Sequence, residues 1–365
     1  MANKKIPWWL PQVGPEEKKY VDQALANNFV NEGELTSRFE KEIAKIVGAK
    51  YALATTSGTV AIFLALKALG IGHGDEVIVP DVTFIGTANA AELTGANPVL
   101  VDVDKKTLTI SSEAIERAIS ERTKAIVPVH VTGRAADMEK ILEIAGNYHL
   151  QVVEDAAEAL GSMHNGKFLG TWSVAGCFSF AANKTISTGQ GGMVVTDDDD
   201  LYECLKPLKN QGRPVRGTGG DDVHDTIGYN FRYTDIQAAL GLGQAEYFSA
   251  RKERMLRNYR LYAENLASVD QLKIYPSVEG ELPQWTDAVA ERRDELIAYL
   301  AALNMDCRKY WFPIHTQLAY KQLDDNFPNS VDLCRRSFWL PSAFTLSDED
   351  VLAVCSEIKK FYHSS

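Results

Sequence analysis

The chain has 365 residues, of which 45% are hydrophobic and 24% are charged, and its formal net charge is −11. A chain of this length can bury a large core, and we expect one large and one smaller domain. An acidic chain without a basic stripe argues against a nucleic-acid partner. The sequence also has no apolar run of about eighteen residues, so we expect no membrane span.

The five cysteines favour a cytoplasmic protein. They are odd in number, widely spaced and form no Cys-x-x-Cys pair, which is typical of reduced thiols. The N-terminal segment lacks a long apolar core followed by a small-residue cleavage site. We therefore expect a cytoplasmic location.

Short apolar strand patterns alternate with helical patterns over the first 200 residues. The predicted strands are 51–55, 76–80, 98–102, 125–129 and 151–155, and the predicted helices between them are 59–69, 85–93, 112–119 and 138–148. Continuous apolar strands separated by helices indicate a mainly parallel sheet covered on both faces. Two later strands, 176–180 and 193–196, are joined by a short loop, so the predicted α/β sheet is mixed.

The C-terminal third is predicted to be mostly helical. A long helix is expected from about 235 to 266, and further helices are expected at 287–303 and 348–361. We therefore predict a large domain over 1–245, which includes the N-terminal segment, and a small α+β domain over 246–365. The glycine-rich stretch 212–222 either closes over a substrate or merely connects two elements, and the sequence leaves both alternatives open.

Polar segments follow several predicted strands at the ends where ligands bind in open parallel sheets. These segments are 55–59, 81–84, Asp155 and 179–184. Because carboxyl ends of parallel strands lie at one edge of a sheet, all four are expected to face one crevice.

Lys184 is the most informative residue near this crevice. It lies between two apolar strand runs, with glycines just beyond it, which a solvated surface lysine does not explain. Loss of hydration makes the neutral amine available to attack an aldehyde. Asp155 ends an apolar strand, where a carboxylate would keep the ring nitrogen of pyridoxal 5′-phosphate (PLP) protonated. Asp155 alone could equally cap the next helix, but the pair predicts a PLP site.

Other residues near the crevice suit the same cofactor. Ser57-Gly58-Thr59 precedes a predicted helix, where free N–H groups and hydroxyls bind phosphate, although a simple helix cap explains it too. Ser179 offers a further hydroxyl, or is a strand serine bonded to backbone. Glu158 could reach the phenolic oxygen of the ring. Phe84 could stack on the ring, or belong to the core.

Competing sites are not supported. The stretch 70–74 is glycine-rich but precedes a strand, so it is a turn and not a dinucleotide loop. The sequence contains no phosphate loop ending in Gly-Lys-Ser/Thr and no Gly-x-Ser-x-Gly elbow, and its seven histidines have no metal-ligand spacing. We therefore expect no metal.

The motifs taken together resemble the DegT/StrS-type sugar aminotransferases, a branch of the fold-type I PLP enzymes. The matching segments follow the order of that family over almost the whole chain: 56–59, 80–84, 153–159, 178–180 with Asn183-Lys184, 189–193 and 228–239. Glu158 occupies a position that is Gln in many relatives and Glu in some, notably those resembling GDP-perosamine synthases. Gln190 departs from the usual acidic residue, and the stretch around 283–290 is shortened.

The resemblance implies roles for individual residues. Lys184 would attach to the cofactor and then move the proton between cofactor and substrate carbon. Asp155 would pair with the ring nitrogen, Phe84 would cover the ring, and the phosphate would be held by Ser57, Gly58, Thr59 and Ser179. Asn230 would reach the cofactor phosphate of the neighbouring subunit, which implies a homodimer with shared sites. Arg232 would bind the carboxylate of the amino donor, and His315 would line the sugar site.

The implied activity is transfer of an amino group from L-glutamate, through pyridoxamine phosphate, to a keto sugar. The favoured acceptor is a nucleotide-linked 4-keto-6-deoxyhexose, for surface-polysaccharide (lipopolysaccharide O-antigen) or amino-sugar biosynthesis. The alternatives are a 3-keto, acetamido or eight-carbon keto-deoxy sugar. A non-catalytic regulator of the same fold would need a DNA-binding module or a missing lysine, and the sequence has neither feature.

Overall fold

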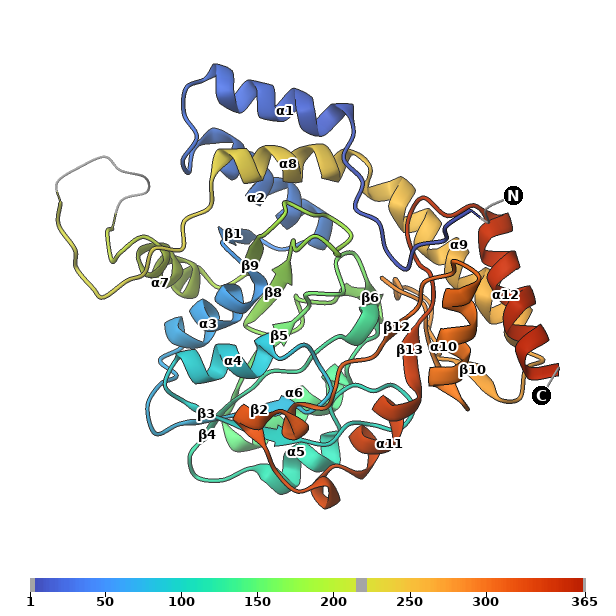
Figure 1. Cartoon of the computed structure of the whole chain (residues 1–365). Coiled ribbons are helices and arrows are strands. Elements are labelled where there is room, and N and C mark those ends of the chain that lie inside the picture. The colour runs from blue at the N-terminus through green and yellow to red at the C-terminus, as the bar shows by residue number, and fades with distance from the viewer. Residues whose placement is uncertain (1–3, 215–221, 364–365) are drawn as a thin grey trace.

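The computed structural model describes residues 4–214 and 222–363 of the chain. Its larger part is built on a seven-stranded sheet with the strand order β1-β9-β8-β5-β4-β2-β3 (Figure 1). The strands are β1 (Tyr51–Thr55), β2 (Glu76–Pro80), β3 (Asn97–Val101), β4 (Thr123–Ile126), β5 (Gln151–Asp155), β8 (Ala175–Ser179) and β9 (Gly192–Thr196). Only β9 runs antiparallel to its neighbours, so the predicted mixed, mostly parallel sheet is confirmed.

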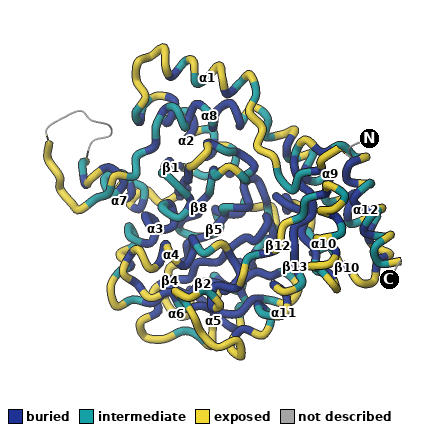
Figure 2. Tube along the Cα trace, in the orientation of Figure 1, coloured by how far each residue is buried: buried dark blue, intermediate teal, exposed yellow. Residues whose placement is uncertain are grey.

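Alternate residues of these strands enter different apolar clusters on the two faces of the sheet. Leu53 packs with α3 (Gly58–Ala68), α4 (Gly86–Leu93) and α7 (Asp199–Lys209) on one face. Its neighbours Ala52 and Ala54 pack with α2 (Glu34–Val47) and α8 (Asp235–Glu246) on the other. Farther along that second face, Ile78 packs with α5 (Ser112–Ala118) and α6 (Met138–Tyr148). The sheet is therefore buried on both sides (Figure 2).

The C-terminal part has a separate apolar cluster. A four-stranded sheet, in the order β10-β11-β13-β12, packs against α9 (Phe248–Leu266), α10 (Arg293–Ala302) and α12 (Asp348–His363). Its strands are β10 (Leu272–Ile274), β11 (Asp287–Ala290), β12 (Arg308–Lys309) and β13 (Ser337–Trp339). Ile6 of the N-terminal segment belongs to this cluster, so the two ends of the chain pack in the same region. The domain boundary near 245 stays a prediction.

The remaining described elements were not predicted individually. They are α1 (Pro15–Ala26), the hairpin β6 (Met163–His164) and β7 (Lys167–Phe168), α11 (Pro328–Arg336), and the short 3-10 turns η1 (Val131–Gly133), η2 (Ile314–Thr316), η3 (Leu318–Tyr320) and η4 (Asp324–Asn326). None of the described helices combines the length and the apolar character needed to cross a membrane.

Two helix predictions are wrong in detail. The stretch 235–266 is two helices, because α8 ends at Glu246 and α9 begins at Phe248. The stretch 287–303 begins as the strand β11, and its helix α10 starts only at Arg293. The segment 287–290 pairs with β10 and β13, a tertiary contact that overrides its weak local helical pattern. Most of the stretch 212–222 lies outside the described residues.

Candidate active site

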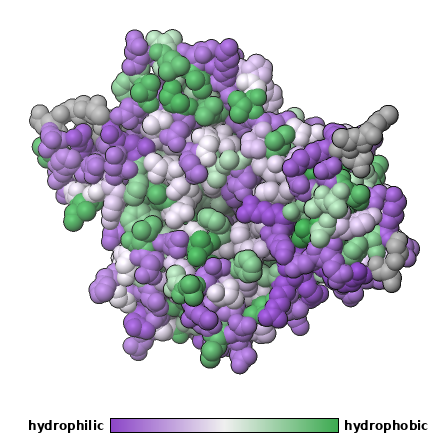
Figure 3. Space-filling view, in the orientation of Figure 1, coloured by the Kyte–Doolittle hydropathy of each residue, from purple (hydrophilic) through white to green (hydrophobic). Residues whose placement is uncertain are grey.

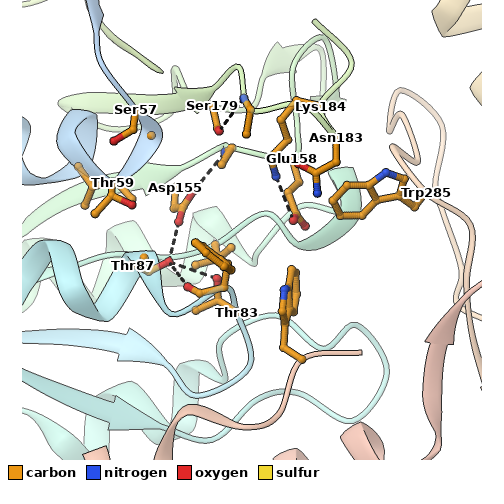
Figure 4. Close-up of a pocket in the computed structure, with 18 of the residues that line it drawn as sticks. Ser57, Thr59, Thr83, Thr87, Asp155, Glu158, Ser179, Asn183, Lys184 and Trp285 are labelled. Atoms are coloured by element: carbon orange, nitrogen blue, oxygen red, sulfur yellow. Dashed lines mark hydrogen bonds and ion pairs between the residues drawn. The ribbon is translucent and has the colours of Figure 1, made fainter. Parts of the chain in front are cut away.

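A cavity opens where β5 and β8 end and α3 begins (Figure 4). Eight of the eleven site residues predicted from the sequence line this one cavity: Ser57, Gly58, Thr59, Phe84, Asp155, Glu158, Ser179 and Lys184. Because β1, β5 and β8 run in the same direction, their carboxyl ends bring these segments together.

Lys184 points at Glu158 inside the cavity. Its Nζ lies 3.2 Å from Oε1 of Glu158, and it also lies 5.1 Å from the ring centroid of Trp285. The side chains of Lys184 and Glu158 are only 11% and 5% exposed. Burial raises the pKa of Glu158, although the nearby Lys184 opposes this shift. The amine is thus held in place by a carboxylate and an indole face (Figure 4).

The backbone N–H of Thr132 holds the other oxygen of Glu158, at 2.9 Å. Thr132 is buried and has a left-handed backbone, with φ of 53°, which a β-branched residue adopts only when its surroundings demand it. Its hydroxyl lies 3.3 Å from Asp287, which also forms a bidentate ion pair with Arg134. Glu158 is therefore connected through Thr132 to strand β11 of the C-terminal sheet.

Asp155 is a buried carboxylate that accepts hydrogen bonds from neutral donors. The Thr87 hydroxyl donates to it at 2.7 Å and the Ala157 N–H at 3.1 Å. Burial raises the pKa of Asp155, and the hydrogen bond from Thr87 opposes this shift. A cation in the cavity would offset the cost of keeping this carboxylate ionised. The protonated ring nitrogen of PLP is such a cation, so Asp155 fits the predicted cofactor.

A second buried carboxylate, Glu154, supports the end of β5 from the opposite side of the strand. The N–H of Ala136 donates to Nδ1 of His130 at 3.2 Å, so Nε2 carries the proton and donates to Glu154 at 2.9 Å. Gly170 and Ser173 supply further donors to Glu154. Because all these donors converge on one carboxylate, they fix the strand from which Asp155 projects.

The start of α3 is shaped to receive a phosphate. Ser57 is its N-cap, and its hydroxyl accepts a hydrogen bond from the Val60 N–H at 3.2 Å. The first N–H groups of a helix have no partner within the helix and favour anions. A Cβ on Gly58 would lie 3.0 Å from Cβ of Ser179, so glycine lets the two polar segments approach. This arrangement fits the phosphate of PLP.

Phe84 also fits the predicted cofactor. Its side chain lines the cavity yet is 58% exposed. Such an exposed fraction is unusual for a large aromatic side chain. Val129 lines the same cavity. A flat heteroaromatic ring bound there would cover Phe84 and gain stacking contacts.

Three predicted site residues do not line the cavity of their own chain. Asn230 is exposed and forms a backbone bridge with Asn210, and Arg232 also lies outside the lining. The ring of His315 is fully buried, and its Nδ1 lies 2.7 Å from Asp81. His315 thus anchors the C-terminal segment to the end of β2, and the structure does not bring it to the predicted sugar site.

Several lining residues were not found from the sequence. Thr87 lies in the first turn of α4, four residues after Thr83, and its hydroxyl bonds to Thr83 and to Asp155. Trp285, Arg308, Trp311 and Trp339 also line the cavity. They come from the C-terminal part of the chain, and no local pattern distinguishes them from core or surface residues.

Comparison with known proteins gives a consistent result over nearly the whole chain. The profile of the DegT/DnrJ/EryC1/StrS aminotransferase family matches residues 11–359. GDP-perosamine synthase of Escherichia coli O157:H7 is 40% identical, with 98% of this chain and 99% of that protein covered. GDP-perosamine synthase of Caulobacter vibrioides is 36% identical, with 93% and 94% covered.

A solved structure agrees with these relatives. DesV of S. venezuelae, in complex with a ketimine intermediate, superposes with a TM-score of 0.91 at 31% identity. The superposition covers 95% of this chain and 94% of DesV. The fold predicted from the sequence is therefore confirmed.

Proposed function

The chain belongs to the DegT/DnrJ/EryC1/StrS aminotransferase family, and we propose that it transfers an amino group from L-glutamate to a nucleotide-linked 4-keto-6-deoxyhexose. The enzymes of this family are PLP-dependent sugar aminotransferases. The identity of the acceptor is supported by two relatives named GDP-perosamine synthase and by Glu158, a residue that the sequence resemblance associates with some relatives of that kind. The placement of Lys184 and Asp155 in one cavity carries the proposal.

Different residues of the cavity would hold different parts of PLP. Ser57, Gly58, Thr59 and Ser179 would bind its phosphate, and Asp155 would keep its ring nitrogen protonated. Phe84 would cover its ring. When bound, the cofactor supplies an electron sink that stabilises negative charge on the carbon that loses a proton.

Lys184 is assigned two tasks. Its amine would hold the cofactor covalently before the reaction, and the same amine, once released, would take the proton from the donor and return a proton to the sugar carbon. Glu158, 3.2 Å away, would keep the amine pointed into the cavity during both steps. Glutamate would leave as its 2-oxo acid before the keto sugar binds, so the kinetics would be ping-pong.

A homodimer with shared sites is part of the proposal. Asn230 is exposed and lies outside its own cavity, as expected of a residue that serves the neighbouring subunit. Hydrophobic residues gather over α1 in Figure 3, and Leu25, Phe29 and Val30 at its end are 46–55% exposed. Such a patch favours contact with another protein surface. Arg232 remains the proposed residue for the donor carboxylate, and His315 remains a prediction for the sugar site.

The experiment is glutamate-dependent amination of a panel of keto sugars by the purified, PLP-loaded protein. The panel contains GDP-, UDP- and dTDP-linked 4-keto-6-deoxyhexoses, together with 3-keto, acetamido and eight-carbon keto-deoxy sugars. We expect amination of a nucleotide-linked 4-keto sugar, detected by mass spectrometry of the product. Amination of only another sugar class would refute the proposed acceptor, and no amination at all would refute the proposed function.

A further inference from the structure

One wall of the cavity is built from tryptophans of the C-terminal part. Trp285, Trp311 and Trp339 line it and are called here the tryptophan wall. The ring centroids of Trp285 and Trp339 are 5.3 Å apart, and those of Trp311 and Trp339 are 4.8 Å apart. Trp8 of the N-terminal segment packs behind them, 5.4 Å from Trp285 and 6.0 Å from Trp339. The wall is thus rigid and apolar.

Arg308 lies against this wall and lines the same cavity. Its guanidinium carbon is 4.8 Å from the ring of Trp8 and 5.6 Å from the ring of Trp339. In the part of the chain that the structure describes, Arg308 forms no ion pair with a carboxylate. The other charged lining residues, Asp155, Glu158 and Lys184, belong to the buried group around the lysine. Arg308 therefore contributes a positive charge that the Lys184 group does not neutralise.

The Arg308 side chain is exposed and its guanidinium lies beside indole rings, so its N–H groups can bind an anion. Such a group matches the geometry of phosphate and carboxylate oxygens in a bidentate manner. Trp285 and Trp339 are only 2% and 1% exposed, so they form the buried base of the wall, and Trp311 is its partly exposed member. The combination indicates a site for an anionic group at Arg308, on this side of the cavity.

The contacts place this anion site within reach of Lys184. Lys184 lies 5.1 Å from Trp285, Trp285 lies 5.3 Å from Trp339, and Trp339 lies 5.6 Å from Arg308. The two cationic groups are therefore no more than about 16 Å apart. The carboxylate of an amino donor is one bond away from the carbon that loses its proton, whereas a sugar phosphate is several bonds away from the keto carbon. Because the proposed acceptor carries a diphosphate, whose oxygens a guanidinium binds in a bidentate manner, that group is the ligand assigned to Arg308.

We propose that Arg308, backed by the tryptophan wall, binds the diphosphate of the sugar nucleotide. The inference rests on the proposed function, because it requires an acceptor that carries phosphate. It assigns substrate recognition to a strand, β12, that the predicted cofactor site does not include.

Binding of nucleoside diphosphates to the PLP-loaded protein tests the assignment. GDP, UDP and dTDP are titrated while tryptophan fluorescence is recorded, and calorimetry gives the dissociation constant. For the nucleotide that binds best, we expect Arg308→Ala to weaken binding at least tenfold and Arg308→Lys to weaken it less. The parent nucleoside should bind both proteins equally weakly. Lys309→Ala is the matched control, because Lys309 is the neighbouring cation in β12 but does not line this cavity, and it should change binding less than twofold.

Two outcomes would overturn the assignment. One is nucleoside diphosphate binding that is absent from the unaltered protein or unchanged in Arg308→Ala. The other is a loss in Arg308→Ala of the spectral change that glutamate alone produces, which would place the donor carboxylate at Arg308. Failure of the proposed function would give a different result. The unaltered protein would then aminate no nucleotide-linked keto sugar, whichever ligand Arg308 binds.

Discussion

The Nζ of Lys184 lies 3.2 Å from Oε1 of Glu158, and both side chains are nearly excluded from solvent. The second oxygen of Glu158 is held by the N–H of Thr132, so the carboxylate cannot turn away from the lysine without losing a buried hydrogen bond. This relationship explains how a long, flexible side chain is kept at one point of the cavity. It also makes the lysine the first residue to test.

Lys184→Ala is expected to lose covalent attachment of PLP and to lower turnover by at least about a hundredfold, because the residue is both the attachment point and the proposed acid and base. Borohydride reduction followed by mass spectrometry measures the attachment directly. Lys140→Ala, which removes a half-exposed lysine from the surface helix α6, is the control and should retain both properties. Normal turnover by Lys184→Ala would contradict the assignment.

Asp155→Asn is expected to stabilise the cofactor-free protein at neutral pH. Burial raises the pKa of Asp155 in the folded state, so the unfolded state ionises more readily and stability falls as the pH rises from the ordinary carboxyl pKa to the raised one. Asparagine removes that loss while keeping partners for Thr87 and Ala157. The gain in unfolding free energy should therefore grow between acidic and neutral pH, as measured by urea unfolding.

PLP binding should stabilise the Asp155→Asn variant less than it stabilises the unaltered protein. Its protonated ring offsets the charge of Asp155, so it should raise the melting temperature of the unaltered protein more than that of Asp155→Asn. An equal rise in both proteins would argue against contact between Asp155 and the ring nitrogen.

Gly192→Ala is expected to weaken PLP binding. A Cβ at Gly192 would lie 2.2 Å from the carbonyl oxygen of Ser57 and 2.7 Å from the N of Gly58, so the phosphate-binding turn must shift. Gly146→Ala is the control, because its Cβ meets nothing within 4 Å in helix α6. That change should stabilise the protein by about 0.5–1 kcal/mol and leave the PLP dissociation constant unchanged. Equal PLP affinity in the two variants would count against the turn.

Asp287→Asn is expected to destabilise the fold by about 3–5 kcal/mol, because it leaves Arg134 as an uncompensated buried charge. The two side chains are only 3% and 6% exposed and form a bidentate pair. Asp332→Asn breaks the solvent-exposed pair with Arg336 and should cost less than about 1 kcal/mol. Urea unfolding of both variants measures the difference, and similar losses would mean that the buried pair contributes little.

Mixing two inactive variants tests the shared sites. If Asn230 serves the partner's cofactor, a hybrid of Lys184→Ala and Asn230→Ala subunits has one site with both mutations and one intact site. After refolding together in equal amounts, about one site in four should be intact under statistical pairing of a two-fold dimer. Activity should therefore reappear in the mixture and stay absent in each variant alone. A mixture as inactive as its components would show that each site lies within one subunit.

The sequence by itself determined the sheet of the large domain and the chemistry of its crevice. Strands 51–55, 76–80 and 151–155 are found at the predicted residues, because continuous apolar runs of that length are stable only inside a sheet covered on both faces. Lys184 and Asp155 could be assigned to one crevice from the sequence, because both lie at or after the ends of predicted strands and parallel strands present their carboxyl ends at one edge.

Tertiary contacts decided the rest. Residues 287–290 form a strand because β10 and β13 pair with them. The tryptophan wall and Arg308 reach the cavity from the C-terminal part of the chain, more than a hundred residues beyond Lys184. His315, for which the sequence predicted a sugar contact, is buried and bonds to Asp81, a contact that no local pattern indicated. Local patterns show which face of an element is apolar, but they carry no information on which distant element will cover it. That tertiary packing determines whether a polar residue is a buried anchor or contacts a ligand.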